Sequence, residues 1–414
     1  MKITLLTVGS TGDVRPFVLL GRELQSRGHN VTLATFSLFE QLVCREGIRF
    51  FSLSGDAEKL MASIMNPDTN GITYLPRLEK ALRKVAPGLI QDMSDSCLGA
   101  DAMVCNFFGS VYYSIAEKHH IPCIQTHFSP LDPNRSFPIS SFRNQHLGSF
   151  VNAASYRLGY LLIGLLEHHF LTSWRKENAL SSRHPRSHPD YQVWGHDVPV
   201  IYAASPLLLS RPKEWNSHIR MSGFWLEDPP DEATPPADLE AFLAKADHPI
   251  YIGFGSMNSG NMNRLMTIVL RALHASGLSA VVNNGWSGSH LKSTRKVFFT
   301  NYVPHDWLFP RVRAVVHHGG AGTVAAGLRW GRPTLVIPFA GDQPFWGNQV
   351  FLAGCGPKPL PRESLTVHRM TRALIDLVSH PDYRLKAEAL SKGLAREHGV
   401  ATAADMIEEE IRSW

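Results

Sequence analysis

The chain has 414 residues, of which 44% are hydrophobic and 19% are charged, and its formal net charge at pH 7 is +5. This composition is typical of a globular protein, and the length favours two domains over a single core. The basic excess is not gathered into basic runs, so the sequence predicts no nucleic-acid partner and leaves anionic substrates or membrane surfaces open as partners.

The sequence contains no evident secretion signal, membrane span or metal site. Met1–Val8 is apolar only briefly before a glycine turn, which predicts a buried strand and not a signal peptide. No run reaches the roughly 20 apolar residues of a membrane span. The five cysteines are widely spaced and form no CxxC pair, which is typical of reduced thiols in a cytoplasmic protein. Prolines interrupt the pair His184 and His188, so no zinc site is assigned.

The first part of the chain alternates apolar runs with amphipathic stretches. Strands are expected over Ile3–Val8, Val31–Phe36 and Ile48–Leu53, and helices from Val14 to about Arg27 and over Phe39–Glu46. This β-α-β-α-β order predicts a parallel sheet with right-handed crossovers.

The turn after the first strand holds only part of a dinucleotide-binding fingerprint. Gly9 and Gly12 are present, but Thr35-Phe36 stands where an acidic residue would end the second strand. An NAD site is therefore weakly supported, and no cofactor is assigned.

The middle of the chain continues the α/β pattern and then becomes irregular. Strands are expected over Asp101–Asn106 and Pro122–Thr126, with a helix over Val111–His119 between them. His127–Phe142 is rich in Pro, Ser and Phe and is expected to be a loop at the edge of the sheet. Phe150–Asn178 is expected to be helical.

The centre of that last helix, Leu158–Leu166, is unusually apolar. Two interpretations stay open at this point. The segment is either a buried core helix, or it is a lipophilic acceptor wall or a membrane-contacting patch.

An acidic, proline-rich stretch, Glu227–Pro236, predicts an exposed linker, and a second α/β pattern follows it. Pro249–Met257 is expected to be a strand that runs into a glycine-serine turn. Met262–Ser276 is expected to be a helix, with strands over Ser279–Asn283 and Val297–Thr300.

Two junctions near the C-terminal end carry the strongest ligand signal. The apolar strand Ala314–Val316 leads through His317-His318-Gly319-Gly320 into a helix near Thr323. Free N–H groups at a helix start attract phosphate, and glycines let an anion approach the backbone. A second apolar run, Thr334–Pro338, ends in Gly341-Asp342-Gln343, which adds an acid and an amide at the same sheet edge. Together these features predict a nucleotide-sugar site.

Individual side chains in this stretch have distinct expected roles. His318 is expected to donate to a diphosphate oxygen, as are the N–H groups that follow it at the helix start. His317 is one residue earlier on an extended backbone, so it is expected to point the other way and to be packed. Asp342 and Gln343 offer acceptors and a donor for sugar hydroxyls.

Asp13 is the most informative polar residue of the N-terminal half. It follows the first strand and lies near a helix start, where it can act as a general base or as a helix cap. Position alone leaves both roles open, and the nucleotide-sugar signal in the other half favours the base.

Five segments, in this order along the chain, resemble family 1 glycosyltransferases of the GT-B fold, in the branch of the sterol glucosyltransferases and the bacterial antibiotic and rhamnolipid transferases. They are Gly9–Phe17, Gly253–Met257, Tyr302–Phe309, His317–Thr323 and Gly341–Trp346. The resemblance implies an α/β protein with two Rossmann-like domains whose parallel sheets face a central cleft. It also implies inverting chemistry that needs no metal and no cofactor.

The resemblance divides the chain as follows. It implies an acceptor-binding domain over residues 1–222, a linker over 223–248 and a nucleotide-sugar domain over 249–395. Residues 396–414 are implied to form a C-terminal helix that packs back on the first domain.

The resemblance also assigns the site. Asp13 matches the proposed catalytic base of this branch. The implied donor-binding residues are Ser256, Tyr302, Val303, His318, Gly320, Ala321, Gly322, Thr323, Asp342 and Gln343. Candidate acceptor or cleft residues are Ser10, Thr11, Gly12, Asn106, His127, Phe128 and Phe137.

The sequence departs from the plant members at two site positions. They use a histidine base where Asp13 stands, supported by an aspartate whose position corresponds roughly to Asn106, so Asp13 is expected to act alone or with His127. Their ribose-binding glutamate is replaced by Ala326, which leaves UDP and dTDP both open as the nucleotide.

We therefore expect a cytoplasmic inverting glycosyltransferase, with peripheral membrane contact as an open option. It is expected to move a hexose from a nucleotide sugar, UDP-glucose first, to a small lipophilic acceptor such as a sterol, terpenoid, polyketide or hydroxy-lipid. The alternatives are a dTDP-deoxysugar-dependent natural-product transferase, an epimerase of the same fold and a catalytically silent partner subunit of a transferase. The oligomeric state is left open.

Overall fold

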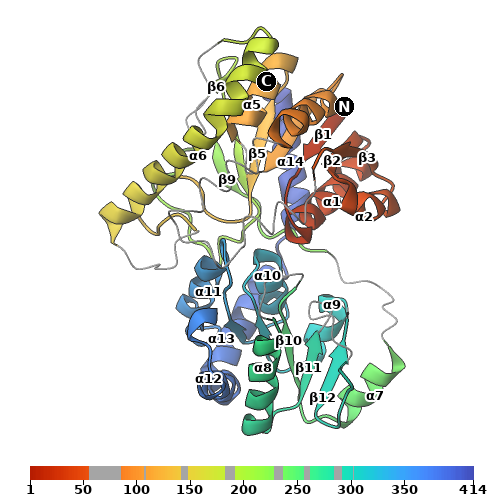
Figure 1. Cartoon of the computed structure of the whole chain (residues 1–414), viewed down its shortest axis with the longest axis vertical. Coiled ribbons are helices and arrows are strands. Elements are labelled where there is room, and N and C mark those ends of the chain that lie inside the picture. The colour runs from red at the N-terminus through yellow and green to blue at the C-terminus, as the bar shows by residue number, and fades with distance from the viewer. Residues whose placement is uncertain are drawn as a thin grey trace.

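The computed structural model describes residues 1–55, 85–106, 109–140, 148–181, 192–227, 236–255, 262–283, 291–301 and 303–414. These residues form an upper and a lower half in Figure 1, each built on its own parallel sheet with helices packed around it. The predicted α/β class with two parallel sheets is confirmed.

The first sheet has seven strands, in the order β3-β2-β1-β4-β5-β8-β9, and all neighbours are parallel. Along the chain the strands are β1 (Lys2–Leu6), β2 (Asn30–Phe36), β3 (Arg49–Leu53), β4 (Ala102–Asn106), β5 (Cys123–His127), β8 (Val200–Tyr202) and β9 (Ile219–Met221). A separate antiparallel hairpin joins β6 (Gln192–Val193) and β7 (His196–Asp197). The order sets β1 beside β4, so the turn that carries Asp13 meets the end of the strand that carries Asn106.

The helices of this half follow from apolar residues at helical spacing. They are α1 (Thr11–Ser26), a turn of 3-10 helix at Ser37–Phe39, α2 (Glu40–Arg45), α5 (Gly109–His119) and α6 (Ser149–Glu177), and residues 85–96 are also helical. In α1 the side chains of Val14, Phe17 and Leu24 are buried against the sheet.

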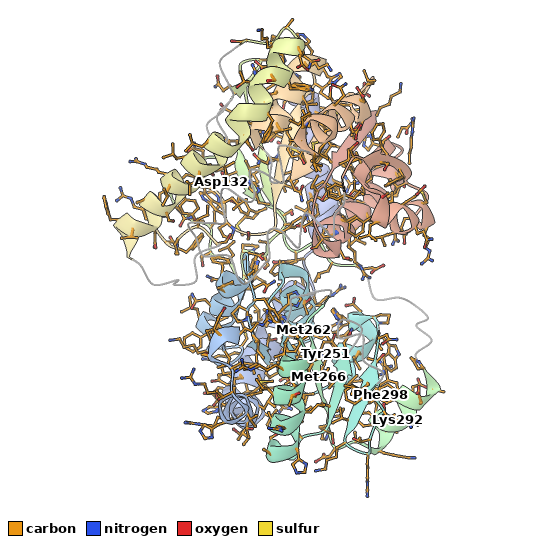
Figure 2. The ribbon with its side chains drawn as sticks, in the orientation of Figure 1. Asp132, Tyr251, Met262, Met266, Lys292 and Phe298 are labelled. Atoms are coloured by element: carbon orange, nitrogen blue, oxygen red, sulfur yellow. The ribbon has the colours of Figure 1, made fainter. Side chains whose placement is uncertain are left out.

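The second sheet has five parallel strands, in the order β12-β11-β10-β13-β14. They are β10 (Ile250–Gly253), β11 (Ala280–Asn283), β12 (Val297–Thr300), β13 (Val315–His317) and β14 (Thr334–Val336). The helices are α7 (Ala237–Lys245), α8 (Met262–Ser276), α9 (His305–Leu308), α10 (Ala321–Arg329), α11 (Gln343–Leu352), α12 (Val367–Ser379), α13 (Pro381–Leu394) and α14 (Gly399–Ser413), with 3-10 turns at Phe309–Arg311 and Arg362–Ser364. Figure 2 shows Tyr251, Met266 and Phe298 inside this lower half, where they belong to its buried core.

The last helix, α14, lies against the upper half although it ends the chain (Figure 1). Ala403, Ala404 and Ile407 are fully buried in the core of the first half. On the helix surface, Arg27 contacts Asp405, with 2.6 Å between the guanidinium nitrogen and the carboxylate oxygen. The helix therefore ties the two ends of the chain into one core.

The two halves also share an aromatic cluster. The ring centroids of Phe137 and Phe345 are 5.2 Å apart, and those of Phe224 and Trp346 are 5.7 Å apart. Each pair joins a residue of the upper half to α11 of the lower half. The segment that precedes α6 is therefore packed directly on the second half.

The apolar centre of α6 is not a core segment. Leu158, Leu161 and Leu165 are 50%, 60% and 65% exposed, so the interpretation of a buried core helix is wrong. These three leucines face away from the protein's own core, whereas Tyr160, Leu162 and Ile163 of the same segment are partly buried. In the part of the chain that the structure describes, no helix is long and apolar enough to cross a membrane.

Candidate active site

The junction between β1 and α1 fixes Asp13 by hydrogen bonds within one turn of chain. Ser10 is the N-cap of α1, and its hydroxyl oxygen accepts from the Gly12 N–H at 3.2 Å. The Ser10 N–H and hydroxyl donate to Oδ2 of Asp13 at 2.7 and 2.9 Å. Asp13 thus completes a capping box with its Oδ2 atom, and no hydrogen bond is recorded for its Oδ1 within the described residues.

The space that holds the Asp13 carboxylate exists because residue 9 is glycine. Gly9 has a φ of 153°, and a Cβ atom built there would lie 2.3 Å from Oδ2 of Asp13. Any larger residue would strain the backbone and push the carboxylate out of its place.

Asn106, at the end of β4, is hydrogen-bonded to the residues that precede this turn. Its side-chain N–H donates to the Thr7 hydroxyl oxygen at 3.0 Å, and its Oδ1 accepts from the Val8 N–H at 3.4 Å. The Thr7 hydroxyl donates in turn to the backbone carbonyl of Asp13 at 3.2 Å. Asn106 therefore holds the backbone of the Asp13 turn through a chain of hydrogen bonds.

Burial raises the pKa of Asp13 above its ordinary value, although the hydrogen bonds from Ser10 act in the opposite direction. A carboxylate with a raised pKa is a stronger base than an exposed aspartate. Capping and base function are compatible here, because they use different oxygens of one side chain.

The junction between β13 and α10 has a different helix start. Gly320 is the N-cap of α10, and no side chain caps the helix. The first N–H groups of a helix have no i−4 partner within it, although the Thr323 N–H here donates to the Gly320 carbonyl at 3.0 Å. Ala321 and Thr323 are half-buried and Gly322 is exposed, so this helix start can receive an anion.

The His318 ring lies between two glycines at this junction. A Cβ atom at Gly255 would be 3.2 Å from its Cε1, and one at Gly320 would be 2.8 Å from its Nε2. Burial lowers the pKa of His318 to about 4, so the ring is neutral at pH 7. Its Nδ1 is buried and has no hydrogen-bond partner among the described residues. A neutral imidazole can donate one N–H, so a ligand contact to His318 needs the nitrogen that carries the proton to face the ligand.

His317 is packed, as predicted. It is fully buried, and its Nδ1 accepts from the Gly319 N–H at 2.9 Å. The two histidine rings stand at 80° to each other, consistent with side chains that leave neighbouring positions in different directions.

The start of α11 holds the acid and amide of the second junction. Asp342 accepts from the Trp346 indole N–H through Oδ2 at 3.1 Å. The amide oxygen of Gln343 accepts from the backbone N–H groups of Phe339 and Ala340 at 2.7 and 3.2 Å. Gln343 is buried, so its oxygen holds the preceding loop, and its contact with a sugar stays a prediction.

The charge of Asp13, in the first half, acts on Asp342, in the second half. Burial and, to a smaller extent, the negative charge of Asp13 together raise the pKa of Asp342 to about 7. Such an effect requires the two carboxyl groups to be near enough to interact electrostatically.

The sequence did not predict the contact that Arg15 makes with the segment leading from the first half to the second. Arg15 of α1 forms an ion pair with Glu227, whose backbone carbonyl accepts from Arg329 of α10 at 2.6 Å. Burial lowers the pKa of His305 to about 4, and the positive charge of Arg15 contributes. Arg15 belongs to the same segment as Asp13, but no local pattern announces a partner 212 positions away.

His127, at the end of β5, faces a buried cluster and not Asp13. Its Nε2 is 3.9 Å from Oδ2 of Asp132, which also accepts from the Tyr202 hydroxyl. Burial lowers the pKa of His127 to about 3. Within the described residues no contact between His127 and Asp13 is recorded. Figure 2 shows Asp132 beside α6. His127 therefore contacts the segment that precedes this helix.

The remaining predicted residues divide into three groups. Phe128 packs on Phe17 and Trp225, with ring centroids 6.2 and 5.8 Å away. Val303 is buried in the core of the second half. Ser256 and Tyr302 lie outside the described residues.

Among the residues that the structure describes, no group of three or more His, Cys, Asp or Glu is placed to hold a metal ion.

Two family models match the chain, one in each half. Residues 3–138 match the glycosyltransferase family 28 N-terminal domain, and residues 282–408 match the C-terminal domain of erythromycin biosynthesis protein CIII-like proteins.

Curated relatives span nearly the whole chain. The sterol 3-beta-glucosyltransferase UGT80A2 of Arabidopsis thaliana is 35% identical over 97% of this chain and 64% of its own length. UGT80B1 of the same plant is 30% identical over 99% of this chain and 68% of its own length. The chain thus spans about two thirds of these relatives. It covers 33% of a sterol 3-beta-glucosyltransferase of Pichia angusta, which is 29% identical.

Solved structures share the fold at low identity. The glycotransferase of kitacinnamycin has a TM-score of 0.72 and 19% identity over 99% of this chain and 98% of its own. The calicheamicin glycosyltransferase CalG4 has a TM-score of 0.70 and 15% identity over the same shares. At these identities the likeness shows the two-domain architecture.

Proposed function

The chain belongs to the glycosyltransferase family that contains the plant sterol 3-beta-glucosyltransferases, and we propose that it transfers a hexose from UDP-glucose to the hydroxyl group of a sterol or sterol-like acceptor. One observation of the site carries this proposal beyond the family. Asp13 of the first half and Asp342 of the second are close enough for the charge of one to raise the pKa of the other.

In the proposed reaction Asp13 removes the proton of the acceptor hydroxyl. Oδ2 is held by Ser10, so Oδ1 takes the proton, and the raised pKa of the carboxyl makes this transfer more favourable. Gly9 and Asn106 keep the carboxylate in place through the turn that they hold.

The acceptor oxygen then forms a bond to the anomeric carbon while the bond from that carbon to the diphosphate breaks. The electron pair leaves with the diphosphate, whose growing negative charge is stabilised by the N–H groups at the start of α10 and by His318. A single displacement of this kind inverts the configuration, so an α-linked donor gives a β-glycoside.

Asp342 is proposed to bind a sugar hydroxyl through the carboxylate oxygen that the Trp346 indole does not occupy. Burial and the negative charge of Asp13 both favour the protonated form of Asp342, so its carboxyl group can donate a hydrogen bond to a sugar hydroxyl when protonated and accept one when ionised.

The choice of nucleotide has a second candidate. Ala326 in α10 is buried and offers no acceptor for a ribose 2′-hydroxyl, so dTDP-sugars, which lack that hydroxyl, stay a candidate donor class. Parallel assays with UDP-glucose and dTDP-glucose at equal concentration separate the two.

The test is donor turnover with and without a sterol. The wild type is expected to release UDP from UDP-glucose only when the sterol is present, and to form a sterol glucoside in equal amount. Asp13→Ala is expected to lose this activity, while Asp382→Asn, an exposed site in α13, keeps it. Absence of turnover with every donor and acceptor contradicts the proposal and supports the silent-subunit alternative. Full turnover by Asp13→Ala contradicts the base assignment alone.

A further inference from the structure

The first turns of helix α6 (Ser149–Glu177) contact the protein through polar groups, whereas its later turns bury Leu171 and Trp174. Asn152 donates to the backbone carbonyl of Arg135 at 3.0 Å, and the Ser155 hydroxyl oxygen accepts from the Ile139 N–H at 2.9 Å. The Tyr160 hydroxyl likewise donates to the Leu131 carbonyl at 2.6 Å. The inner face of the helix is thus held by hydrogen bonds to residues 131–139.

The opposite side of α6 is apolar and exposed. Its large apolar side chains are Phe150 (85% exposed), Val151 (45%), Leu158 (50%), Leu161 (60%) and Leu165 (65%). With the exposed Ala154 they recur every three or four residues from Val151 onward, so they lie along one side of the helix. We call these six residues the α6 stripe.

This arrangement reverses that of an ordinary surface helix, whose apolar side faces the core and whose polar side faces water. In Figure 1 the first turns of α6 reach outward from the sheet of the upper half, with no other element drawn over their outer side. Contiguous exposed apolar surface of this kind marks a binding surface, because leaving it in water is unfavourable.

The charges near the α6 stripe are positive. Residues 149–166 contain no Asp or Glu, and Arg157, on the flank of the stripe, is exposed. Arg135, on the segment bonded to the first turns of α6, is also exposed. An apolar stripe with arginines at its border complements a surface that is apolar inside and negative outside.

The dimensions favour a bilayer over a second protein chain. A stable protein interface buries roughly 800 Å² on each partner and involves about 20 to 30 residues a side. The α6 stripe has six residues on one helix. A helix that lies in the plane of a membrane interface needs no larger surface, because only its apolar side enters the lipid.

We propose that α6 docks on a lipid bilayer that carries anionic headgroups, with the α6 stripe inserted among the acyl chains and Arg157 and Arg135 at the headgroups. This interaction does not depend on the proposed transferase activity. It does have a structural route to the site: residues 131–139 bind the inner face of α6, and Phe137 packs on Phe345 of the second half. Docking therefore presents this segment, next to both halves, to the membrane surface.

The test is flotation of the purified full chain with vesicles of phosphatidylcholine alone and with 30% phosphatidylglycerol, a composition on the order of that of anionic membranes. The wild type is expected to float with the anionic vesicles and several-fold less with the neutral ones. The triple variant Leu158→Glu/Leu161→Glu/Leu165→Glu is expected to bind at least about tenfold less, since glutamates neither enter the lipid nor approach anionic headgroups. Leu385→Glu, which adds a charge at a leucine of α13 that is 57% exposed, is the matched control and is expected to float like the wild type.

Three results contradict the proposal: a wild type that does not float with anionic vesicles, a triple variant that floats like the wild type, or a wild-type dimer that the triple variant converts to a monomer. The last result assigns the α6 stripe to a second copy of the chain. The melting temperature of each variant shows whether it is folded, and Arg157→Gln, which leaves the leucines in place, is expected to weaken anionic binding by a smaller factor. Turnover of a detergent-dissolved sterol is expected to be unchanged in the triple variant, so failure of the docking and failure of the transferase proposal give different results.

Discussion

The junctions β1–α1 and β13–α10 have the same local plan, a strand, a glycine-containing turn and a helix, but opposite helix starts. At the first, Ser10 and Asp13 cap the helix, and a carboxylate occupies the place where an anion would bind. At the second, Gly320 leaves the helix without a side-chain cap, and a neutral histidine lies beside it. The same fold element is thus closed to an anion by a carboxylate in one half and has no side-chain cap in the other.

This difference teaches that function follows from the few residues at the helix start and not from the fold element. A general base must be free to take a proton from the acceptor hydroxyl. A diphosphate needs N–H groups that no carboxylate already occupies. The predictions below change one junction at a time.

The largest effect is expected from Asp13→Asn. An asparagine can still accept the Ser10 N–H, so the helix cap is kept, but it takes no proton from an acceptor hydroxyl. We expect turnover to fall by about 10²- to 10⁴-fold, with donor binding little changed. Steady-state rates together with calorimetric UDP binding measure both. A loss confined to UDP affinity would show that Asp13 belongs to donor binding.

A smaller loss is expected from Gly320→Ala at the second junction. The backbone there suits alanine, with φ −61° and ψ 140°, but its Cβ would lie 2.8 Å from Nε2 of His318 and displace the ring. We expect kcat/KM for the donor to fall by about 10- to 100-fold, as for loss of one oxyanion donor or less. Gly164→Ala, in α6, is the control, since a Cβ there has no atom within 4 Å and the position is outside the proposed donor site. Equal losses in both variants would contradict the role of His318.

The carboxyl pair predicts a pH-dependent stability. The folded-state pKa of Asp342 is raised to about 7 from an ordinary 3.8, so between these values the folded chain holds a proton that the unfolded chain releases. The stability contributed by Asp342 is therefore lost as the pH rises from about 4 to about 7. Asp342→Asn has no proton to lose there, and its melting temperature is expected to exceed that of the wild type by at least about 2 °C at pH 8 and to match it near pH 4. A constant difference at all pH values would show that Asp342 is not buried as described.

The smallest effect is expected from Ser10→Ala. The variant loses the hydroxyl that donates to Oδ2 of Asp13 at 2.9 Å and keeps the backbone N–H. Since this hydrogen bond lowers the pKa of Asp13, its loss raises that pKa, and the acidic limb of the kcat/KM profile shifts to higher pH by less than about one unit. Ser10→Thr keeps a hydroxyl and is expected to keep the profile. A shift toward lower pH would contradict the description of this turn.

The sequence was most informative where function is written into consecutive residues. The strand–turn–helix pattern predicted both parallel sheets, because alternating apolar runs and turns are local signals. The packing of His317 followed from its place beside His318 on an extended strand. The site roles assigned to Asp13, His318, Asp342 and Gln343 stay predictions that the experiments above address.

The sequence was least informative where a side chain's role depends on distant partners. Nothing local distinguishes Asn106 as the support of the Asp13 turn, because its partners lie 98 and 99 positions away. Arg15 and Glu227 are 212 positions apart in the sequence and meet only in the folded chain. The apolar centre of α6 has the same composition whether it is buried or exposed, so only packing decided between the two interpretations.

The central claim is that Asp13 directs a single displacement at the anomeric carbon, with the leaving diphosphate held at the other junction. The measurement that tests it most directly is the anomeric configuration of the first-formed product from α-linked UDP-glucose and a sterol, followed by proton NMR. The account predicts a β-glycoside from the first turnover. An α-glycoside, or release of UDP without any glycoside, would contradict it.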